Sequence, residues 1–407
     1  MTASHSTSNK AVWHALGSRY AMMLASLGVV WLNSHFLGTS GLGTIALINA
    51  GILLQVMISG CVAGGALVYL VPRMNAGKLL GAGLLWMMLS VAITGVVFLL
   101  VDIVPAEWRL HTLALGLLQS AFFFLQQLML GQERIRHYNY LLAFQPLSLL
   151  FLLLMFYIGY HDVSVTSFVI CLYLSFIATL FVTVRRWGVK QLRFHFVGWR
   201  TSMTEVLRFG WKAQAGNLFH LINLRGPSVL LEHSLANARP LIGLLALGLY
   251  ACEAVWNVAK SLSTVQYARI ANMQETTEMK SLTRSYMRRS VLFTSAAALV
   301  VALFPDAWYS AILGTDVGGL HTVMLCLLPA LMANSTSIIL AHYFSGRGAY
   351  HVTMQASLIG LIPAMAFGIL FIPTYGLAAA TAMVSIALVV QSAVLWWWYS
   401  RGKAVHH

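Results

Sequence analysis

Twelve apolar stretches of about 20 residues follow one another along this chain of 407 residues. A helix of about 20 residues crosses the roughly 30 Å hydrocarbon layer of a bilayer. The stretches are too long and unbroken for the short alternating strands of a membrane β-barrel. They therefore predict an all-α polytopic membrane protein with about 12 transmembrane helices. The expected spans are 13–36, 43–71, 79–101, 111–130, 138–160, 164–184, 209–231, 242–267, 290–305, 318–343, 351–372 and 376–399.

Composition agrees with a membrane protein and excludes a water-soluble fold. Hydrophobic residues make up 59% of the chain and charged residues only 9%, whereas soluble domains carry roughly 25% charged residues. The four cysteines lie in apolar runs without a CxxC motif, and the fourteen histidines show no metal-ligand spacing. No GxxxxGK[ST] motif is present. We therefore expect no metal, no cofactor and no direct use of ATP.

The net charge of +14 comes from cations in short segments between the apolar stretches. Nucleic-acid binding would need these cations on one soluble face, so no nucleic-acid partner is expected. If the N-terminus is cytoplasmic, 19 of the 25 Lys and Arg residues fall in cytoplasmic segments, two fall in outer loops and four fall inside spans. This bias follows the positive-inside rule. It predicts a multi-pass protein of a bacterial cytoplasmic (inner) membrane with both termini in the cytoplasm.

The spans divide into two similar sets of six. Gly17-Ser18-Arg19 opens the first span and Gly210-Trp211-Lys212 opens the seventh, with the two cations 193 positions apart. Both sets enter the membrane from the same side, which indicates a parallel pseudo-repeat about an axis along the membrane normal. The predicted parts are a cytoplasmic tail at 1–12, an N-terminal six-helix lobe at 13–184, a basic cytoplasmic interfacial linker at 185–208, a C-terminal six-helix lobe at 209–399 and a cytoplasmic tail at 400–407.

Four cations inside spans are the first candidates for function: Arg225, Lys260, Arg19 and Lys212. A charge inside a span is costly and usually faces a cavity, a partner or a pathway. Arg19 and Lys212 lie near span ends, so snorkelling to the interface remains an alternative for them, and outward snorkelling remains one for Arg225. Arg225 lies two residues before Pro227, which we expect to break the helix. Polar residues of the same region are cavity candidates: Asn217, His220, Asn223 and Asn257.

Glu253 is the only carboxylate within the expected spans. It lies seven residues before Lys260, so the two share one helix face. Two interpretations stay open: Glu253 neutralises a nearby cation to hold the lobe together, or it titrates or binds a coupling cation, a proton or sodium, during transport. A pathway with up to four cations and one carboxylate favours an anionic substrate, because Lys and Arg bind phosphate oxygens through charge-assisted hydrogen bonds.

Several segments resemble the polysaccharide and O-antigen flippases of the multidrug/oligosaccharidyl-lipid/polysaccharide exporter superfamily. They are FLGTSGLGTIAL from Phe36, LMLGQERIRHYN from Leu128, LLPALMANSTSIILAHYFSGRGAY from Leu327 and FIPTYGLAAATAMVSIAL from Phe371. The resemblance implies two six-helix lobes around a central cavity that opens alternately to each side. It also implies a prenyl-pyrophosphate glycan as substrate, with membrane lipids, a glycan polymerase and other assembly proteins as partners.

The leading hypothesis is therefore a secondary transporter that flips a lipid-linked oligosaccharide from the inner to the outer leaflet for surface polysaccharide biosynthesis. A multidrug or other small-solute antiporter of the same superfamily is the main alternative. A membrane glycan polymerase or glycosyltransferase is less favoured, because the longest outer segment, 305–318, has little room for a catalytic loop. We expect no enzyme activity.

The charge bias generates a test of topology. Reporter domains fused after Lys403 and at Asp162 should report opposite sides of the membrane, because inverting the chain would place most cations outside. The measurement is the activity of a reporter that is active on one side only. Fusions that report the same side at both positions would contradict the twelve-span topology.

Overall fold

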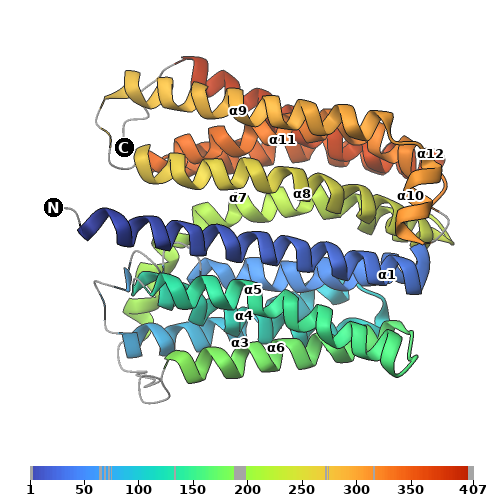
Figure 1. The fold of residues 1–407 in the computed structure, drawn as a ribbon, viewed down its shortest axis with the longest axis horizontal. Coiled ribbons are helices and arrows are strands. Elements are labelled where there is room, and N and C mark those ends of the chain that lie inside the picture. The colour runs from blue at the N-terminus through green and yellow to red at the C-terminus, as the bar shows by residue number, and fades with distance from the viewer. Residues whose placement is uncertain are drawn as a thin grey trace. The chain divides into compact units, whose positions relative to one another are not determined.

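The computed structural model is helical throughout the residues it describes. These are 3–63, 67, 70–71, 74, 76–132, 134–187, 199–270, 273, 275–314 and 317–401, and none of them is in a strand. The helices, joined by short connections, are α1 (Ala3–Ala63), α3 (Ala76–Leu100), η1 (Ala106–Trp108), α4 (Arg109–Gly131), α5 (Ile135–Leu154), η2 (Met155–Gly159), α6 (Val165–Trp187), α7 (Trp199–Ser234), α8 (Ala238–Ile270), α9 (Thr276–Leu303), α10 (Asp306–Leu313), α11 (Leu320–Gly346) and α12 (Tyr350–Arg401) (Figure 1).

Two of these helices are each a pair of spans joined at a glycine. α1 has a non-helical residue at Gly38, with φ 65°, and α12 has one at Gly376, with φ 52°. Positive φ is open to glycine at little cost, so these are the points at which the chain can reverse. A straight helix of 52 residues, the length of α12, would be about 78 Å long, more than twice the hydrocarbon thickness. With each pair divided at its glycine, the described residues of all twelve expected spans fall largely within helices.

Nine helices of the described part are long and apolar enough to cross a membrane. α7 is long enough, with 36 residues, but it is not apolar enough to be counted among them. Its sequence carries Asn217, His220, Asn223 and Arg225 within three turns. The long helix that is not apolar enough to count as a span is therefore the one that holds most of the polar candidates.

The helices form two compact units. Unit 1 comprises residues 1–37 and 47–214, and unit 2 comprises residues 38–46 and 215–407. In unit 1, α4 packs against α3, α5 and α6; in unit 2, α11 packs against α8, α9 and α12. The division falls inside α7. Of the expected linker 185–208, residues 185–187 belong to α6 and 199–208 begin α7, while 188–198 lie outside the described residues.

Some hydroxyl side chains are buried among the helices, and many large apolar side chains are exposed. Fully buried positions include Ser175, Thr179 and Thr183, spaced four residues apart on α6, and the hydroxyls of both threonines donate to backbone carbonyls one turn earlier. By contrast, Leu100 and Leu299 are 78% and 62% exposed. An apolar exterior and a hydrogen-bonded polar interior are the arrangement that hydrocarbon surroundings require.

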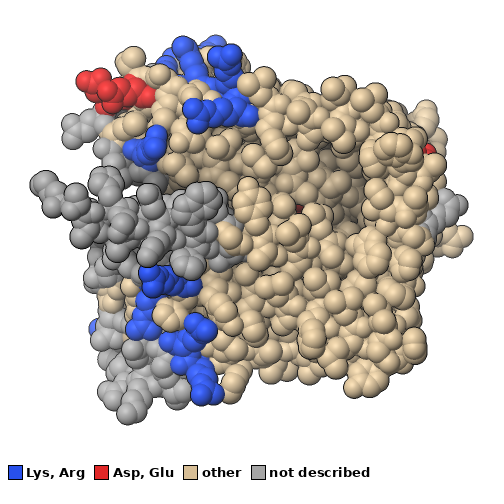
Figure 2. Space-filling model, viewed as in Figure 1, with Lys and Arg blue, Asp and Glu red and all other residues tan. Residues whose placement is uncertain are grey.

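In both units, cations lie near the ends of helices, as at the end of α6 in unit 1 and of α12 in unit 2. In unit 2, Ile270 at the end of α8, Met279 near the start of α9 and Phe344 near the end of α11 belong to one buried cluster, which also contains Tyr399. Figure 2 shows Lys and Arg gathered over the first half of α9, where the sequence has Lys280, Arg284, Arg288 and Arg289. In unit 1, the guanidinium of Arg186 lies 4.1 Å from the ring centre of Tyr140.

Gly43 and Gly243 mark a close backbone approach in unit 2. A Cβ added to Gly43 would overlap the carbonyl oxygen of Arg239, and one added to Gly243 would overlap that of Thr39. Small residues allow such contacts between membrane helices, because backbone atoms of one helix can lie directly against the other. The segment 38–46 is held against α8 by this pair of glycines.

We expect Gly243→Ala to lower the stability of the folded protein by about 1–3 kcal/mol, the usual cost of overpacking a tight contact. Gly17→Ala is the matched control, because a Cβ at Gly17 meets no atom within 4 Å. Melting temperatures in detergent provide the measurement. Equal melting temperatures for the two variants would show that the Gly43–Gly243 contact does not constrain the fold.

Candidate functional site

An ion pair inside unit 2 joins two of the candidate residues. The guanidinium Nη2 of Arg225 in α7 lies 2.7 Å from the carboxylate Oε1 of Glu253 in α8 and donates a hydrogen bond to it. The side chain of Arg225 is 11% exposed and that of Glu253 is 31% exposed. The ring of Tyr250, one turn before Glu253, lies 5.4 Å from the guanidinium carbon, within cation–π range. Arg225 therefore has both a counter-charge and an aromatic contact.

α7 continues past Pro227 to Ser234, so the expectation that Pro227 breaks this helix was wrong. Proline has no N–H, so the carbonyl of Asn223, four residues earlier, receives no helical hydrogen bond from residue 227. A helix tolerates this loss where neighbouring groups or water satisfy the carbonyl. The continuous helix places Arg225 toward α8 while His220 and Asn223 make contacts with α12.

A second polar cluster lies between α7 and both halves of α12. His220 Nδ1 lies 3.2 Å from Oε1 of Gln391, and the amide Nδ2 of Asn223 donates to the carbonyl of Ser357 at 3.2 Å. Asn223, Ser357 and Gln391 are all less than 5% exposed. His220 is also within electrostatic range of both Glu253 and Lys260. The polar groups of three helices thus meet in the interior of unit 2.

Two oxygen atoms of this cluster, Oδ1 of Asn223 and Oγ of Ser357, are buried without a hydrogen-bond partner among the described residues. Buried polar atoms are normally satisfied by protein or by ordered water. Oxygen atoms of this kind are also ligands that hard cations accept. No group of three or more His, Cys, Asp or Glu suited to a metal occurs in the described part of the chain.

The remaining candidates are not brought into the ion pair. Lys260 is exposed on α8, and Asn257 is partly exposed and accepts a hydrogen bond from Ser261 through its backbone carbonyl. Asn217 is exposed on α7. Lys212 is exposed and belongs to unit 1, with its ammonium 6.0 Å from the ring centre of Trp211. The side chain of Arg19 lies outside the described residues.

Sequence reasoning missed Tyr250, Ser357 and Gln391. Tyr250 lies three residues before Glu253, a spacing that places both on one helix face. Gln391 is an amide within the apolar run MVSIALVVQSAVL, which is a detectable signal because an unpaired amide is costly in hydrocarbon. Ser357 has no comparable signal, since serine is common in membrane helices.

The fold can be compared with known structures. No family model matches the sequence, and no curated protein matches it. Among solved structures, a mutant of the MATE transporter VcmN of Vibrio cholerae is 16% identical over 99% of both chains, with a TM-score of 0.66. An inward-facing multidrug resistance MATE family transporter of the MOP superfamily is 14% identical over 93% of both chains, with a TM-score of 0.71.

The lipid II flippase MurJ, in an inward closed conformation, is 13% identical over 96% of this chain and 87% of its own, with a TM-score of 0.68. At these identities the likeness shows the fold. The chain therefore has the all-helical fold of these membrane proteins, with two six-helix lobes, and the predicted fold class is confirmed.

We expect Glu253→Gln to lower the stability of the folded protein, because it leaves the largely buried Arg225 without its counter-charge. Breaking a fully buried pair costs about 3–5 kcal/mol, and the partial exposure of Glu253 reduces the expected loss to about 1–3 kcal/mol. Adding Arg225→Met should recover part of the loss, since it removes the unpaired cation. Melting temperatures in detergent, arranged as a double-mutant cycle, measure the coupling.

Glu232→Gln is the control for this cycle. Oε1 of Glu232 lies 3.6 Å from Nε of Arg239, and the side chain of Arg239 is 42% exposed. Removing the charge of Glu232 should therefore change stability by less than about 1 kcal/mol. If Glu253→Gln is no more destabilising than this control, the Arg225–Glu253 pair does not stabilise unit 2.

Proposed function

We propose that the protein is a secondary transporter that flips an anionic lipid-linked oligosaccharide, carried on a prenyl pyrophosphate, from the inner to the outer leaflet by alternating access. The observation that carries the proposal is a part-buried arginine, held by one carboxylate, inside a fold shared with MATE transporters and with a lipid II flippase. The setting is a bacterial inner membrane, with both termini in the cytoplasm. The product would enter surface polysaccharide biosynthesis.

The Arg225–Glu253 pair suggests how substrate binding is sensed. A pyrophosphate offers more anionic oxygen atoms than one carboxylate, and guanidinium binds such groups with two parallel hydrogen bonds. The incoming headgroup would therefore compete with Glu253 for Arg225. Once released from Arg225, the carboxylate would need a new counter-charge, because a free charge near the bilayer interior is costly. A proton or a sodium ion would supply it, which couples substrate binding to cation binding.

The other intramembrane cations extend this proposal. Lys260 lies two turns beyond Glu253 on α8 and is exposed, so it can add a further contact to an anionic headgroup. Lys212 and Arg19 are proposed as additional cations along the pathway. Asn217 and Asn257 are proposed to hydrogen-bond sugar hydroxyls. His220 and Asn223 are proposed to support the arrangement from the α7–α12 interior, where the unpartnered oxygen atoms of Asn223 and Ser357 lie.

A multidrug antiporter is the second candidate function, favoured by the multidrug MATE transporter among the similar structures. The two functions need opposite charge at the site. A cationic drug requires an unpaired carboxylate, whereas Glu253 is paired with Arg225 in this structure. Glycan polymerases and other assembly proteins would be partners of a flippase and not of a drug exporter.

We expect Arg225→Ala to reduce export of surface glycan by roughly tenfold or more, since a hydrogen bond to a charged group contributes about 1.5–3 kcal/mol. Arg225→Lys should be impaired less, because it keeps the charge and loses only the bidentate geometry. Arg239→Ala is the control: it removes a partly exposed arginine of the same unit that also lies near a glutamate. Export is measured in cells that contain equal amounts of membrane-inserted protein.

The same strains also separate the two candidate functions. Loss of glycan export without a change in resistance to cationic dyes supports the flippase. Wild-type glycan export by Arg225→Ala, together with lost dye efflux, would favour the antiporter instead.

A further inference from the structure

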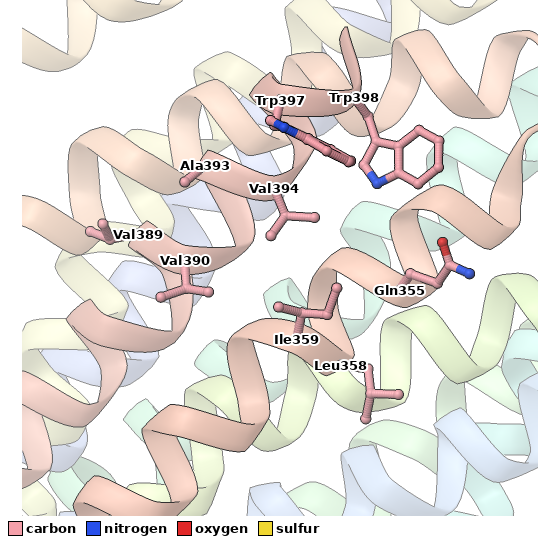
Figure 3. A pocket seen from close by; sticks show the side chains of 9 residues that line it. All are labelled: Gln355, Leu358, Ile359, Val389, Val390, Ala393, Val394, Trp397 and Trp398. Carbon is pink, nitrogen blue, oxygen red and sulfur yellow. The ribbon is translucent and has the colours of Figure 1, made fainter. Parts of the chain in front are cut away.

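An apolar groove of about 710 Å³ runs between the two halves of α12 (Figure 3). Its walls include Leu358 and Ile359 from the first half and Val389, Val390, Ala393 and Trp397 from the second. Leu358, Ile359, Val389 and Trp397 are each at least 37% exposed. The groove is therefore open along an apolar face of unit 2.

The shape of the groove follows from the packing of the two half-helices. At Gly360 they touch: an added Cβ would lie 2.5 Å from the carbonyl oxygen of Ala387. Beside this contact, the small side chain of Ala393 stands between the longer side chains of Val389 and Trp397 on the same helix face. Figure 3 shows the aliphatic side chains of both halves along the groove and the two indoles of Trp397 and Trp398 at one end of it.

One cation lies at that indole end, and others lie beside the neighbouring buried Tyr399. The guanidinium carbon of Arg401, the last residue of α12, lies 4.1 Å from the ring centre of Trp397. The neighbouring Tyr399 donates a hydrogen bond to the carbonyl of Lys280, and the ammonium of Lys280 lies 5.9 Å from the ring centre of Tyr399. Arg284 is within electrostatic range of Tyr399. Tryptophan beside arginine is typical of the headgroup level of a membrane protein.

We propose that the groove binds one acyl chain of an anionic phospholipid from the leaflet that faces this cationic end, with the lipid phosphate on Arg401. The stretch from Val389 to Trp397 is about 12 Å long, close to the roughly 15 Å hydrocarbon depth of one leaflet. The aliphatic lining fits a hydrocarbon chain, and Arg401 beside Trp397 at the mouth fits a negative headgroup. The site uses no residue of the Arg225–Glu253 pair, so it does not depend on the flippase proposal.

Native mass spectrometry of the full-length protein in detergent tests the site. The probes are phosphatidylglycerol and phosphatidylcholine with identical acyl chains. We expect phosphatidylglycerol to bind about fivefold more tightly, the ratio that one cation at a membrane surface provides. Arg401→Gln should remove this preference, because it weakens the binding of phosphatidylglycerol more than that of phosphatidylcholine, whose choline already offsets the phosphate charge.

Ala393→Trp should block both lipids, because the added indole fills the floor of the groove. Leu370→Trp is the matched control, since Leu370 lies on the same helix, is 69% exposed and does not line the groove. If Ala393→Trp does not yield folded protein, Val389→Trp fills the groove from its exposed rim. Full lipid binding by a folded groove variant overturns the proposal.

Two other results would also overturn it. Equal affinity for phosphatidylglycerol and phosphatidylcholine would show that Arg401 does not select the headgroup. A long-chain polyprenyl phosphate that displaces phosphatidylglycerol from the wild-type protein, and that itself fails to bind Ala393→Trp, would assign the groove to the carrier lipid of a transported substrate and not to a membrane phospholipid.

Discussion

The lack of water in hydrocarbon is the constraint on which this structure depends. Every backbone N–H and C=O within the bilayer needs a partner in the protein, and a helix supplies these partners from its own chain. The same constraint acts on side chains, so hydroxyls such as those of Thr179 and Thr183 bond to the helix that carries them. It also explains why large apolar side chains such as Leu100 face outward. Helical structure, buried hydroxyls and an apolar exterior have one physical cause.

Against this background, a charge inside a helix needs a specific partner. Arg225 has one in Glu253, and the contact of its guanidinium with Tyr250 limits the exposure of the pair. A part-buried ion pair is weak evidence for stability alone, because apolar residues often pack as well at lower cost in desolvation. The arginine of the pair lies in α7, the long helix that is not apolar enough to count as a span, whereas the glutamate lies in α8, which is. The pair is neutral as a whole, and a competing anion would separate its two charges.

The sequence predicted the number, type and approximate position of the spans, because about 20 apolar residues in a row leave few alternatives. It was less informative where a helix leaves the hydrocarbon. α9 was expected from residue 290 but begins at Thr276, since its first half carries Lys280, Arg284 and Arg288 and lacks an apolar signal. Arg225 and Glu253 were both candidates, but α7 and α8 had to be placed before they could be paired. Gln391 stands out as an amide in an apolar run, but its partner His220 and the contact of Ser357 with Asn223 could not be read from the sequence, because these residues lie more than 100 positions apart.

The tight contact of Gly43 with Gly243 also has a consequence for biosynthesis. The two glycines lie 200 positions apart in the sequence, and ribosomes add roughly 5–20 residues per second. The segment 38–46 therefore enters the membrane about 10–40 s before the part of α8 that covers it has been made. During that interval its glycine-rich backbone surface faces lipid or an insertion factor. The Gly43–Gly243 contact cannot form until about 60% of the chain has been translated, and unit 2, which runs to residue 407, closes only when synthesis is finished.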